Sequence, residues 1–241
     1  MNTLDLSVIL PIYNELDNIS PLIDDIENAL PSYLKYEILC IDDCSTDGTD
    51  ILLEKLAKEK KHVRYIKHLR NYGQSASVMT GCVEGYGKFL LTMDADIQND
   101  PSDIPKFLKA MNNKVDCVCG IRQKRQDSFI KLFSSKLANS FRSFILHDSI
   151  HDAGCGFRIL RKKAVIDLPI FNGIYRFIPI ILSAQGGFVK EIPIKHNSRF
   201  AGVSKYGIHN RLWRGLVDCF GVWWYCRRVI PFRRIKKNLE N

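Results

Sequence analysis

The first half of the chain alternates short apolar runs with amphipathic segments, and this alternation restricts the fold more than any other feature. The apolar runs, such as LSVILPIYN, are continuous, as in strands buried on both faces of a sheet. The expected strands lie at 6–14, 36–43, 63–68, 88–96 and 115–122, and the expected helices at 18–30, 46–60, 73–85 and 102–113. This order predicts an α/β fold with a Rossmann-like, mostly parallel sheet and helices on both faces.

The helix caps and the second half of the chain show weaker sequence patterns. Helix 46–60 is expected to begin at a Thr or Asp cap, and helix 102–113 at Ser102. Residues 127–147 have the pattern of a partly amphipathic helix. Residues 151–165 indicate a loop, a short strand and the start of a helix, and residues 186–200 indicate a strand followed by a polar loop.

Polar side chains gather where the expected strands end. They are Asn14, Glu15, Asp42, Asp43, Asp94, Asp96 and Arg122. The carboxyl ends of parallel strands share one edge of the sheet, and ligands bind outside that edge. Because core packing does not require polar residues there, this edge is the expected site.

The stretch MDADIQNDP places Asp94 and Asp96 one residue apart after an apolar run. Two such charges repel each other, and a divalent cation would offset the repulsion. Mg²⁺ and Mn²⁺ favour carboxylates combined with substrate phosphates, and Gln98 adds a neutral oxygen nearby. The alternative is a helix cap and a solvated turn before Pro101.

Two further loops follow strands at the same edge. Pro11 cannot donate to a sheet ladder, so PIYNE marks a strand end or edge and leaves Glu15 near the site. Asp42, in IDDCSTDGT, is able to accept hydrogen bonds from a nucleobase or a ribose. Residues 45–49 fit a purely structural turn and helix cap as well as they fit a part in the site.

Several enzyme classes lack their motifs in this chain. No Walker loop, no GxGxxG after the first strand and no GxSxG are present, which argues against a kinase, a dinucleotide enzyme and a serine hydrolase. The eight cysteines form no CxxC pair, and no histidine pair completes a zinc site. Buried, reduced thiols fit a reducing cytoplasm.

The charge of the chain is concentrated at its end. Residues 208–241 hold eight basic and two acidic residues, or +6 of the formal +9. A basic end on a nearly neutral body suggests an anionic surface, either lipid or nucleic acid. Nucleic acid is disfavoured because basic residues mix with aromatic ones only in this tail.

The tail also has a helical apolar pattern. Leu212, Leu216 and Phe220 are spaced by four, and Trp213, Val217 and Trp224 lie near the same face. Trp and Tyr flanked by arginines are typical of a helix at a membrane interface, and a core-packing or partner-binding helix is the alternative. Neither a signal peptide nor a membrane-spanning stretch is expected.

Six motifs occur in the order typical of one family: VILPIYNE, IDDCSTDGT, NYGQSASVMTG, MDADIQNDP, DAGCGFRIL and RFAGVSKYG. Over residues 5–207 the chain resembles family 2 glycosyltransferases of the GT-A fold, in particular polyprenyl-phosphate glycosyltransferases of the dolichol-phosphate mannose synthase type. The resemblance implies a catalytic domain at 1–207 and a basic, aromatic, membrane-interfacial tail at 208–241.

The resemblance also assigns roles to residues. It implies that Asp94, Asp96 and Gln98 bind Mg²⁺ or Mn²⁺. The nucleotide-sugar contacts that it implies are Pro11, Tyr13, Glu15, Asp42, Asp94, Ala95 and Asp96. The phosphate contacts that it implies are Arg122, Arg199, Ser204 and Lys205, with Arg122 facing the acceptor.

The implied reaction is metal-dependent, inverting transfer of a sugar from a GDP- or UDP-linked donor to undecaprenyl or dolichyl phosphate. It would take place at the cytoplasmic face of the membrane, by a peripheral protein with a possible membrane subunit, and supply lipid-linked sugar for the cell envelope. Because the acceptor phosphate is already anionic, no strong base is needed, and Asp152 is either a base or a holder of its loop. The alternatives are a soluble or polysaccharide acceptor, and a non-catalytic, membrane-associated nucleotide-sugar-binding module.

Overall fold

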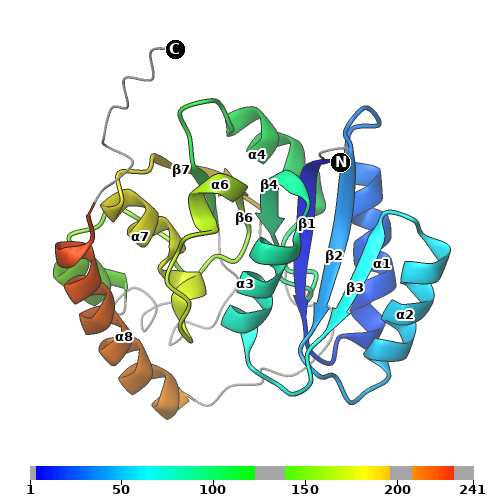
Figure 1. The fold of residues 1–241 in the computed structure, drawn as a ribbon, viewed down its shortest axis with the longest axis horizontal. Helices are drawn as coiled ribbons and strands as arrows, with labels where there is room; N and C mark the ends of the chain where they lie inside the picture. Colours follow the sequence, from blue (N-terminus) through cyan, green and yellow to red (C-terminus); the bar gives the residue numbers. More distant parts are fainter. Residues whose placement is uncertain (1–3, 123–138, 196–207, 231–241) are drawn as a thin grey trace.

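A seven-stranded sheet forms the centre of the molecule in this computed structural model, which describes residues 4–122, 139–195 and 208–230 (Figure 1). The strand order is β3-β2-β1-β4-β6-β5-β7. The strands are β1 (Leu4–Ile12), β2 (Tyr36–Asp42), β3 (Val63–Lys67), β4 (Gly87–Thr92), β5 (Cys117–Arg122), β6 (Arg158–Arg161) and β7 (Val189–Ile194). Only β6 runs antiparallel to its neighbours, β4 and β5, so the expected mostly parallel α/β sheet is confirmed.

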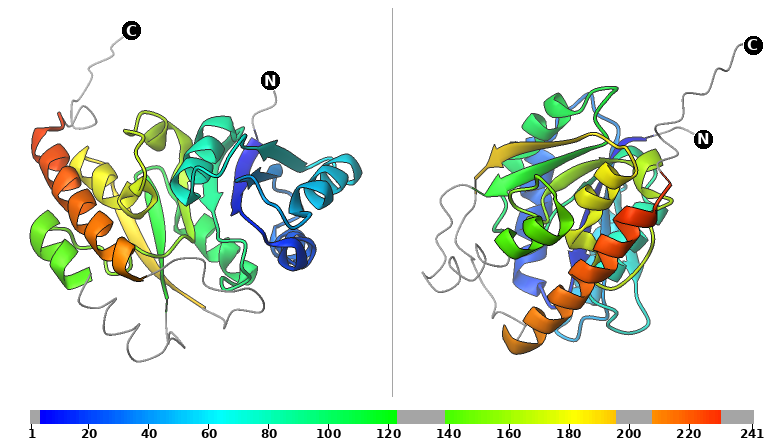
Figure 2. Two further views of the ribbon diagram at one scale, coloured as in Figure 1. Left: turned by 90° about the horizontal axis from the view of Figure 1, so that it is seen from below. Right: turned by 90° about the vertical axis from the view of Figure 1, so that its left-hand side faces the viewer.

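Helices cover both faces of the sheet (Figure 2). They are α1 (Leu16–Ala29), α2 (Thr49–Glu59), α3 (Gln74–Glu84), η1 (Pro101–Asp103), α4 (Ile104–Ala110), the helical residues 139–146, α6 (Lys162–Val165), η2 (Ile174–Arg176), α7 (Ile178–Ala184) and α8 (Ile208–Arg228). Apolar residues of α1, α2 and α4 belong to one core cluster, and those of α3, α6, α7 and α8 belong to the other.

Each strand contributes side chains to both clusters because successive side chains point to opposite faces of the sheet. In β1, Leu6, Val8 and Leu10 join the first cluster, and Ile9 joins the second. All four are fully buried. A strand buried on both faces has no polar face, which explains why the apolar runs are continuous.

Some predicted boundaries were wrong. The fourth strand ends at Thr92, so Asp94 and Asp96 lie in the turn that follows it rather than within a strand. The cap before η1 is Asp100, whose side chain accepts a hydrogen bond from the Ser102 backbone N–H, and not Ser102 itself. The Asp100 side chain lies two residues before the Ser102 amide, and its carboxylate can reach that N–H group.

The start of α2 also differs from the expected cap. Gly48 precedes the helix with a positive φ of 92°, and it has no side chain to cap with. The Asp47 carboxylate instead accepts hydrogen bonds from the backbone N–H and the hydroxyl of Thr49. Of the expected helix 127–147, residues 139–146 are helical, and residues 127–138 lie outside the described part of the chain.

The helix α8 confirms the expected helix in the tail but has two apolar stripes. Cys219 and Val222 are buried in the second core cluster. Val217, Phe220 and Trp224 remain exposed at 69%, 57% and 59%. The helix therefore both packs on the core and presents apolar side chains to the outside. In the described residues, no helix combines the length and apolar character needed to cross a membrane.

Candidate active site

The carboxyl ends of the strands bring together residues that are far apart in sequence. Asp94 follows β4, Arg122 ends β5, and Asp152 lies in the loop before β6. Gly154 approaches the Arg122 guanidinium, and Gly156 approaches the Asp94 carboxylate. The loop 152–156 thus lies against both side chains.

Asp94 is a half-buried carboxylate beside a second carboxylate, that of Asp96. Loss of solvation, reinforced by the neighbouring Asp96 carboxylate, raises its pKa to about 6. The positive charges of Arg122 and Arg158 and a hydrogen bond from Gln74 oppose this shift. A cation beside this carboxylate would favour its ionised form and lower its pKa.

Asp96 and its neighbours form a tight turn. Ile97 has a positive φ of 59°, an unusual conformation for a β-branched residue. The backbone N–H of Gln98 lies 3.3 Å from Asp96 Oδ1, which helps to orient that carboxylate. Asp96 is 9% exposed and is thus more deeply buried than Asp94.

The donor set fits a magnesium or manganese ion that is shared with a substrate. Two carboxylates lie together, and the described residues contain no cluster of three or more His, Cys, Asp or Glu suited to a metal. Mg²⁺ characteristically binds one or two carboxylates and takes its other ligands from phosphates and water. The two aspartates alone would therefore form an incomplete site that a diphosphate completes.

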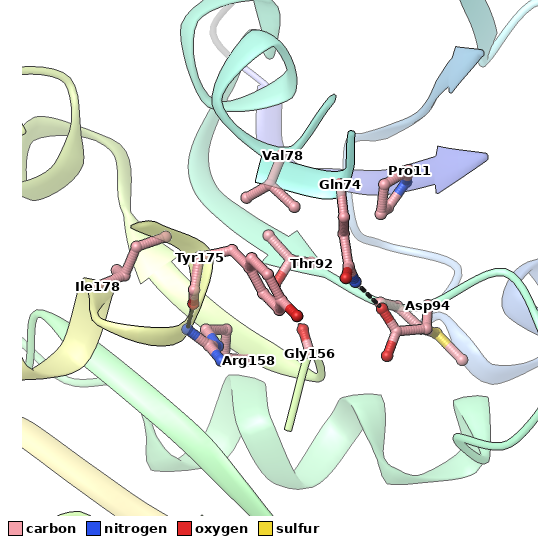
Figure 3. A pocket seen from close by; sticks show the side chains of 10 residues that line it. Pro11, Gln74, Val78, Thr92, Asp94, Gly156, Arg158, Tyr175 and Ile178 are labelled. Carbon is pink, nitrogen blue, oxygen red and sulfur yellow. Dashed lines mark hydrogen bonds between the residues drawn. The ribbon is translucent and has the colours of Figure 1, made fainter. Parts of the chain in front are cut away.

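A small cavity adjoins Asp94 on the side of α3 (Figure 3). Its lining includes Pro11, Gln74, Asp94, Gly156, Arg158 and Tyr175. Figure 3 shows the Gln74 amide reaching down to the Asp94 carboxylate, with Tyr175 on the opposite wall. The cavity is thus walled by the ends of β1 and β4, the start of α3 and η2.

Arg122 is held by Asp152 in a bidentate pair. Its Nε donates to Asp152 Oδ2 at 2.7 Å, and its Nη2 donates to Oδ1 at 2.8 Å. Burial lowers the pKa of Arg122, but the hydrogen bonds and charge of Asp152 outweigh that effect and raise it overall. The guanidinium is consequently a fixed positive charge at the edge of the site.

The loop that carries Asp152 is anchored to β7. Glu191 Oε1 accepts a hydrogen bond from the His151 backbone N–H at 3.0 Å, and Oε2 lies 2.8 Å from His151 Nδ1. Asp152 itself is 8% exposed. These contacts place Asp152 against Arg122 and make it part of a structural chain that links β5, the loop and β7.

Sequence reasoning missed Arg158, which is 2% exposed. Its guanidinium donates to the backbone carbonyls of Ala153, Cys155 and Tyr175. It therefore fixes the loop beside Asp94 and the turn that carries Tyr175. The signal in the sequence is a lone arginine within the otherwise apolar run GFRIL.

The loops after β1 and β2 are tied to each other. The Asn14 backbone N–H donates to Ser45 Oγ at 2.9 Å, and the Thr46 N–H donates to Asn14 Oδ1 at 2.8 Å. The Glu15 N–H donates to Thr49 Oγ1 at 3.1 Å. Ser45, Thr46 and Thr49 therefore make the structural contacts of a turn and helix start.

Asp42 lies fully buried beneath these loops. Its Oδ1 accepts hydrogen bonds from the backbone N–H and the hydroxyl of Ser45. Its Oδ2 is buried without a hydrogen-bond partner within the described parts of the chain. A buried acceptor without a partner costs free energy, and a donor group on a ligand would recover it.

The remaining residues that were predicted to contact ligand differ in where the structure places them. Pro11 pairs with Ile41 of β2 and lies beyond the last β1–β4 pair, so it sits near a strand end as expected. Tyr13 follows β1 and is partly buried. Ala95 is 4% exposed, which leaves its backbone as the part that a ligand would reach. Arg199, Ser204 and Lys205 lie outside the described residues.

Comparison with known proteins identifies the family of the chain. The sequence model described as glycosyl transferase family 2 matches residues 7–168. The chain belongs to this family. It is 32% identical over 233 residues to the dodecaprenyl-phosphate galacturonate synthase of Rhizobium johnstonii, covering 94% of this chain and 69% of the relative. It is 36% identical over 217 residues to the undecaprenyl-phosphate 4-deoxy-4-formamido-L-arabinose transferase of Edwardsiella ictaluri, covering 88% and 67%.

A solved structure confirms the GT-A fold of this family 2 member. The glucosyl-3-phosphoglycerate synthase of Mycobacterium tuberculosis, in complex with Mg²⁺ and uridine diphosphate, superposes with a TM-score of 0.68 at 16% identity, over 90% of this chain and 80% of that one. The chain is therefore a glycosyltransferase, which rules out the non-catalytic alternative.

Proposed function

We propose that this glycosyltransferase transfers a sugar from a GDP- or UDP-linked donor to a polyprenyl phosphate, with inversion at the anomeric carbon. The observation that carries the proposal is the juxtaposition of Asp94 and Asp96 with the Arg122–Asp152 pair. Two neighbouring carboxylates and a fixed positive charge at one edge support a shared metal and phosphate site. Both relatives named above carry polyprenyl phosphate in their names, which supports the acceptor class.

The donor side of the site consists of the two aspartates and the β1 and β2 loops. Asp94 and Asp96 would hold Mg²⁺ or Mn²⁺, with Gln98 adjacent, and a divalent ion supplies Lewis-acid stabilisation of a departing diphosphate. The nucleoside would lie against Pro11, Tyr13, Glu15, Asp42 and the Ala95 backbone. The orphaned Oδ2 of Asp42 supports this placement.

The acceptor side is centred on Arg122. Its guanidinium would orient the lipid phosphate, and Arg199, Ser204 and Lys205, in the motif RFAGVSKYG, would add phosphate contacts. The acceptor oxygen is already anionic, so the protein must position it in line with the anomeric carbon rather than remove a proton. Asp152 then acts as the partner that aligns Arg122.

The membrane part of the proposal rests on α8. Its exposed stripe of Val217, Phe220 and Trp224 is followed by the exposed Arg227 and Arg228. Apolar and aromatic side chains enter the interface of a bilayer, while arginines contact anionic headgroups. We infer that residues 208–241 rest on the cytoplasmic face of the membrane, as a peripheral attachment to the catalytic domain at 1–207, alone or with a membrane subunit.

A transfer assay tests the proposed reaction. Purified protein would receive radiolabelled GDP- and UDP-sugars, a short-chain polyprenyl phosphate and Mg²⁺ or Mn²⁺, and label would be counted in the organic phase. We expect label from one donor, dependent on the metal. Asp96→Asn should abolish it, whereas Asp25→Asn, at an exposed position on α1, should not.

The assay also separates the acceptor classes. Label that appears only in the aqueous phase with a soluble phosphorylated acceptor would replace the lipid acceptor by a soluble one. Metal-independent label at full rate would overturn the role of Asp94 and Asp96. The identity of the productive donor names the sugar and the nucleotide.

A further inference from the structure

Gln74 makes a hydrogen bond that directly touches the proposed metal site. It is the first residue of α3, and its Nε2 donates to Asp94 Oδ1 at 2.7 Å (Figure 3). An ionised carboxylate only accepts hydrogen bonds, so the nitrogen of the amide must face it. Figure 3 shows the second carboxylate oxygen pointing away from Gln74.

The segment before Gln74 is fixed by a buried carboxylate. Asp43, 3% exposed at the end of β2, accepts hydrogen bonds from the backbone N–H groups of Tyr72 and Gly73, at 2.9 and 2.7 Å. Gly73 has a φ of 89°, a conformation that L side chains rarely adopt. The backbone that enters α3 is thus held in one conformation.

A second tie fixes the body of α3 to the same carboxylate. His68 Nδ1 lies 2.8 Å from Asp43 Oδ1, and its Nε2 lies 3.0 Å from Thr80 Oγ1 in the middle of α3. On the other side, Ser75 Oγ accepts a hydrogen bond from the Gly173 N–H at 2.8 Å. The start of α3 is therefore positioned from both directions.

The Asp94 carboxylate has little freedom between these groups. A Cβ at Gly156 would come within 2.7 Å of both carboxylate oxygens, so the backbone of Gly156 lies directly against them. Gln74 contacts the carboxylate from α3. The orientation of the Asp94 carboxylate therefore depends on the hydrogen bond from Gln74.

We propose that Gln74 is a positioning residue for Asp94, which holds the carboxylate in the orientation that presents its other oxygen to the divalent cation. The loop 68–73, held by Asp43, in turn holds Gln74. The inference rests on the proposed function, because it takes Asp94 and Asp96 as the cation ligands. Residues that orient metal ligands in this way typically contribute 10- to 100-fold to metal affinity or activity.

Mn²⁺ binding to the full chain tests the proposal without relying on turnover. Electron paramagnetic resonance would measure free Mn²⁺ during titration, with and without UDP or GDP. Gln74→Met keeps nearly the same side-chain length and removes the donor, and it should weaken Mn²⁺ binding by roughly 10-fold. Gln74→Asn keeps the amide but shortens the side chain, and it should act in the same direction.

Gln185 provides the matched control. Its Nε2 donates to the Tyr225 hydroxyl at 3.0 Å, between α7 and α8 and away from the aspartates. Gln185→Met removes a comparable hydrogen bond and should leave Mn²⁺ affinity unchanged. Thermal unfolding of all variants would show that each one is folded at the assay temperature.

The outcomes separate the inference from the proposed function. Unchanged Mn²⁺ affinity in folded Gln74→Met and Gln74→Asn would overturn the positioning role. Weaker affinity in these variants would sustain it, even if the wild type transferred no sugar to polyprenyl phosphate. A wild type that binds no Mn²⁺ with or without nucleotide would overturn both the cation site and the role of Gln74.

Discussion

Among single residues, Asp94 shows most directly how the site departs from ordinary packing. It is half-buried beside another carboxylate, and loss of solvation, reinforced by the Asp96 charge, raises its pKa to about 6 from 3.8. A native carboxyl with a raised pKa holds its proton over a pH range where the unfolded chain has lost it. Folding stability therefore falls as pH rises from about 3.8 to about 6, and stays lowered above that.

Asp94→Asn should remove this penalty in the absence of metal. The shift of about two pH units corresponds to roughly 3 kcal/mol. With EDTA present to remove metal, the free energy of unfolding of the variant minus that of the wild type should increase between pH 4 and pH 6. Above pH 6 this difference should stay constant. Denaturant unfolding at several pH values measures it, and a difference that does not depend on pH would contradict the assignment.

Gly156 is constrained by the same carboxylate. An alanine Cβ there would lie 2.7 Å from the Asp94 oxygens, closer than real Cβ contacts. Gly156→Ala should therefore displace Asp94, destabilise the fold by about 1–3 kcal/mol and weaken Mn²⁺ binding at least 10-fold. Calorimetry and metal titration check these effects.

Gly221→Ala is the control for this change. Nothing lies within 4 Å of a Cβ at Gly221 in α8, so the substitution should be neutral or slightly stabilising. Equal behaviour of the two variants would show that the close approach of Gly156 to Asp94 has no consequence.

At the scale of elements, the Arg122–Asp152 pair joins the end of β5 to the loop before β6. Glu191 on β7 holds the neighbouring His151. The side chain that we propose as the acceptor contact thus depends on β5, β7 and the loop before β6, which are distant in sequence.

Asp152→Asn separates positioning from base catalysis. If Asp152 positions Arg122, the substitution should raise the KM for the acceptor by about 10-fold. It should change kcat by less than about threefold and leave the pH profile unaltered. General-base catalysis contributes typically 10²- to 10⁴-fold. Steady-state kinetics of the transfer reaction across pH 5.5–8.5 distinguishes the two roles.

The control for Asp152→Asn is Asp167→Asn, at an exposed position after α6, which should behave as the wild type. Glu191→Gln should raise the acceptor KM less than Asp152→Asn, because it loosens the loop and leaves the pair itself in place. A kcat loss of 100-fold or more in Asp152→Asn, with the acidic limb of the pH profile removed, would make Asp152 the base.

At the scale of the whole molecule, α8 lies on the outside of the fold next to α7 (Figure 2). One of its stripes packs into the second core cluster, and the other is exposed. An apolar side chain contributes roughly 1.5–3 kcal/mol when it leaves water. Phe220→Ser and Trp224→Ser should therefore each weaken binding to vesicles of anionic and neutral phospholipid by about 10-fold or more. Co-sedimentation measures the bound fraction.

Tyr33→Ser provides the matched control, because Tyr33 is 82% exposed in the loop after α1, on the opposite side of the sheet. Transfer to a water-soluble short-chain acceptor should be unchanged in all three variants. Vesicle binding that resists both α8 changes would place the membrane contact elsewhere.

The sequence by itself determined the order of strands and helices, the edge that carries the site, and the pair Asp94 and Asp96. Strands buried on both faces leave a continuous apolar run, and polar residues are tolerated only where those runs end. Local spacing therefore carries this information.

Only the tertiary structure decided the direction of β6, the partners of Asp94 and Arg122, and the division of α8 into a buried and an exposed stripe. Each of these depends on contacts between segments that lie far apart in the chain. Gln74 and Asp94 are 20 residues apart, and Arg122 and Asp152 are 30 apart. A pattern of neighbouring residues predicts which element forms, whereas the partner of a buried charge is set by where the elements pack.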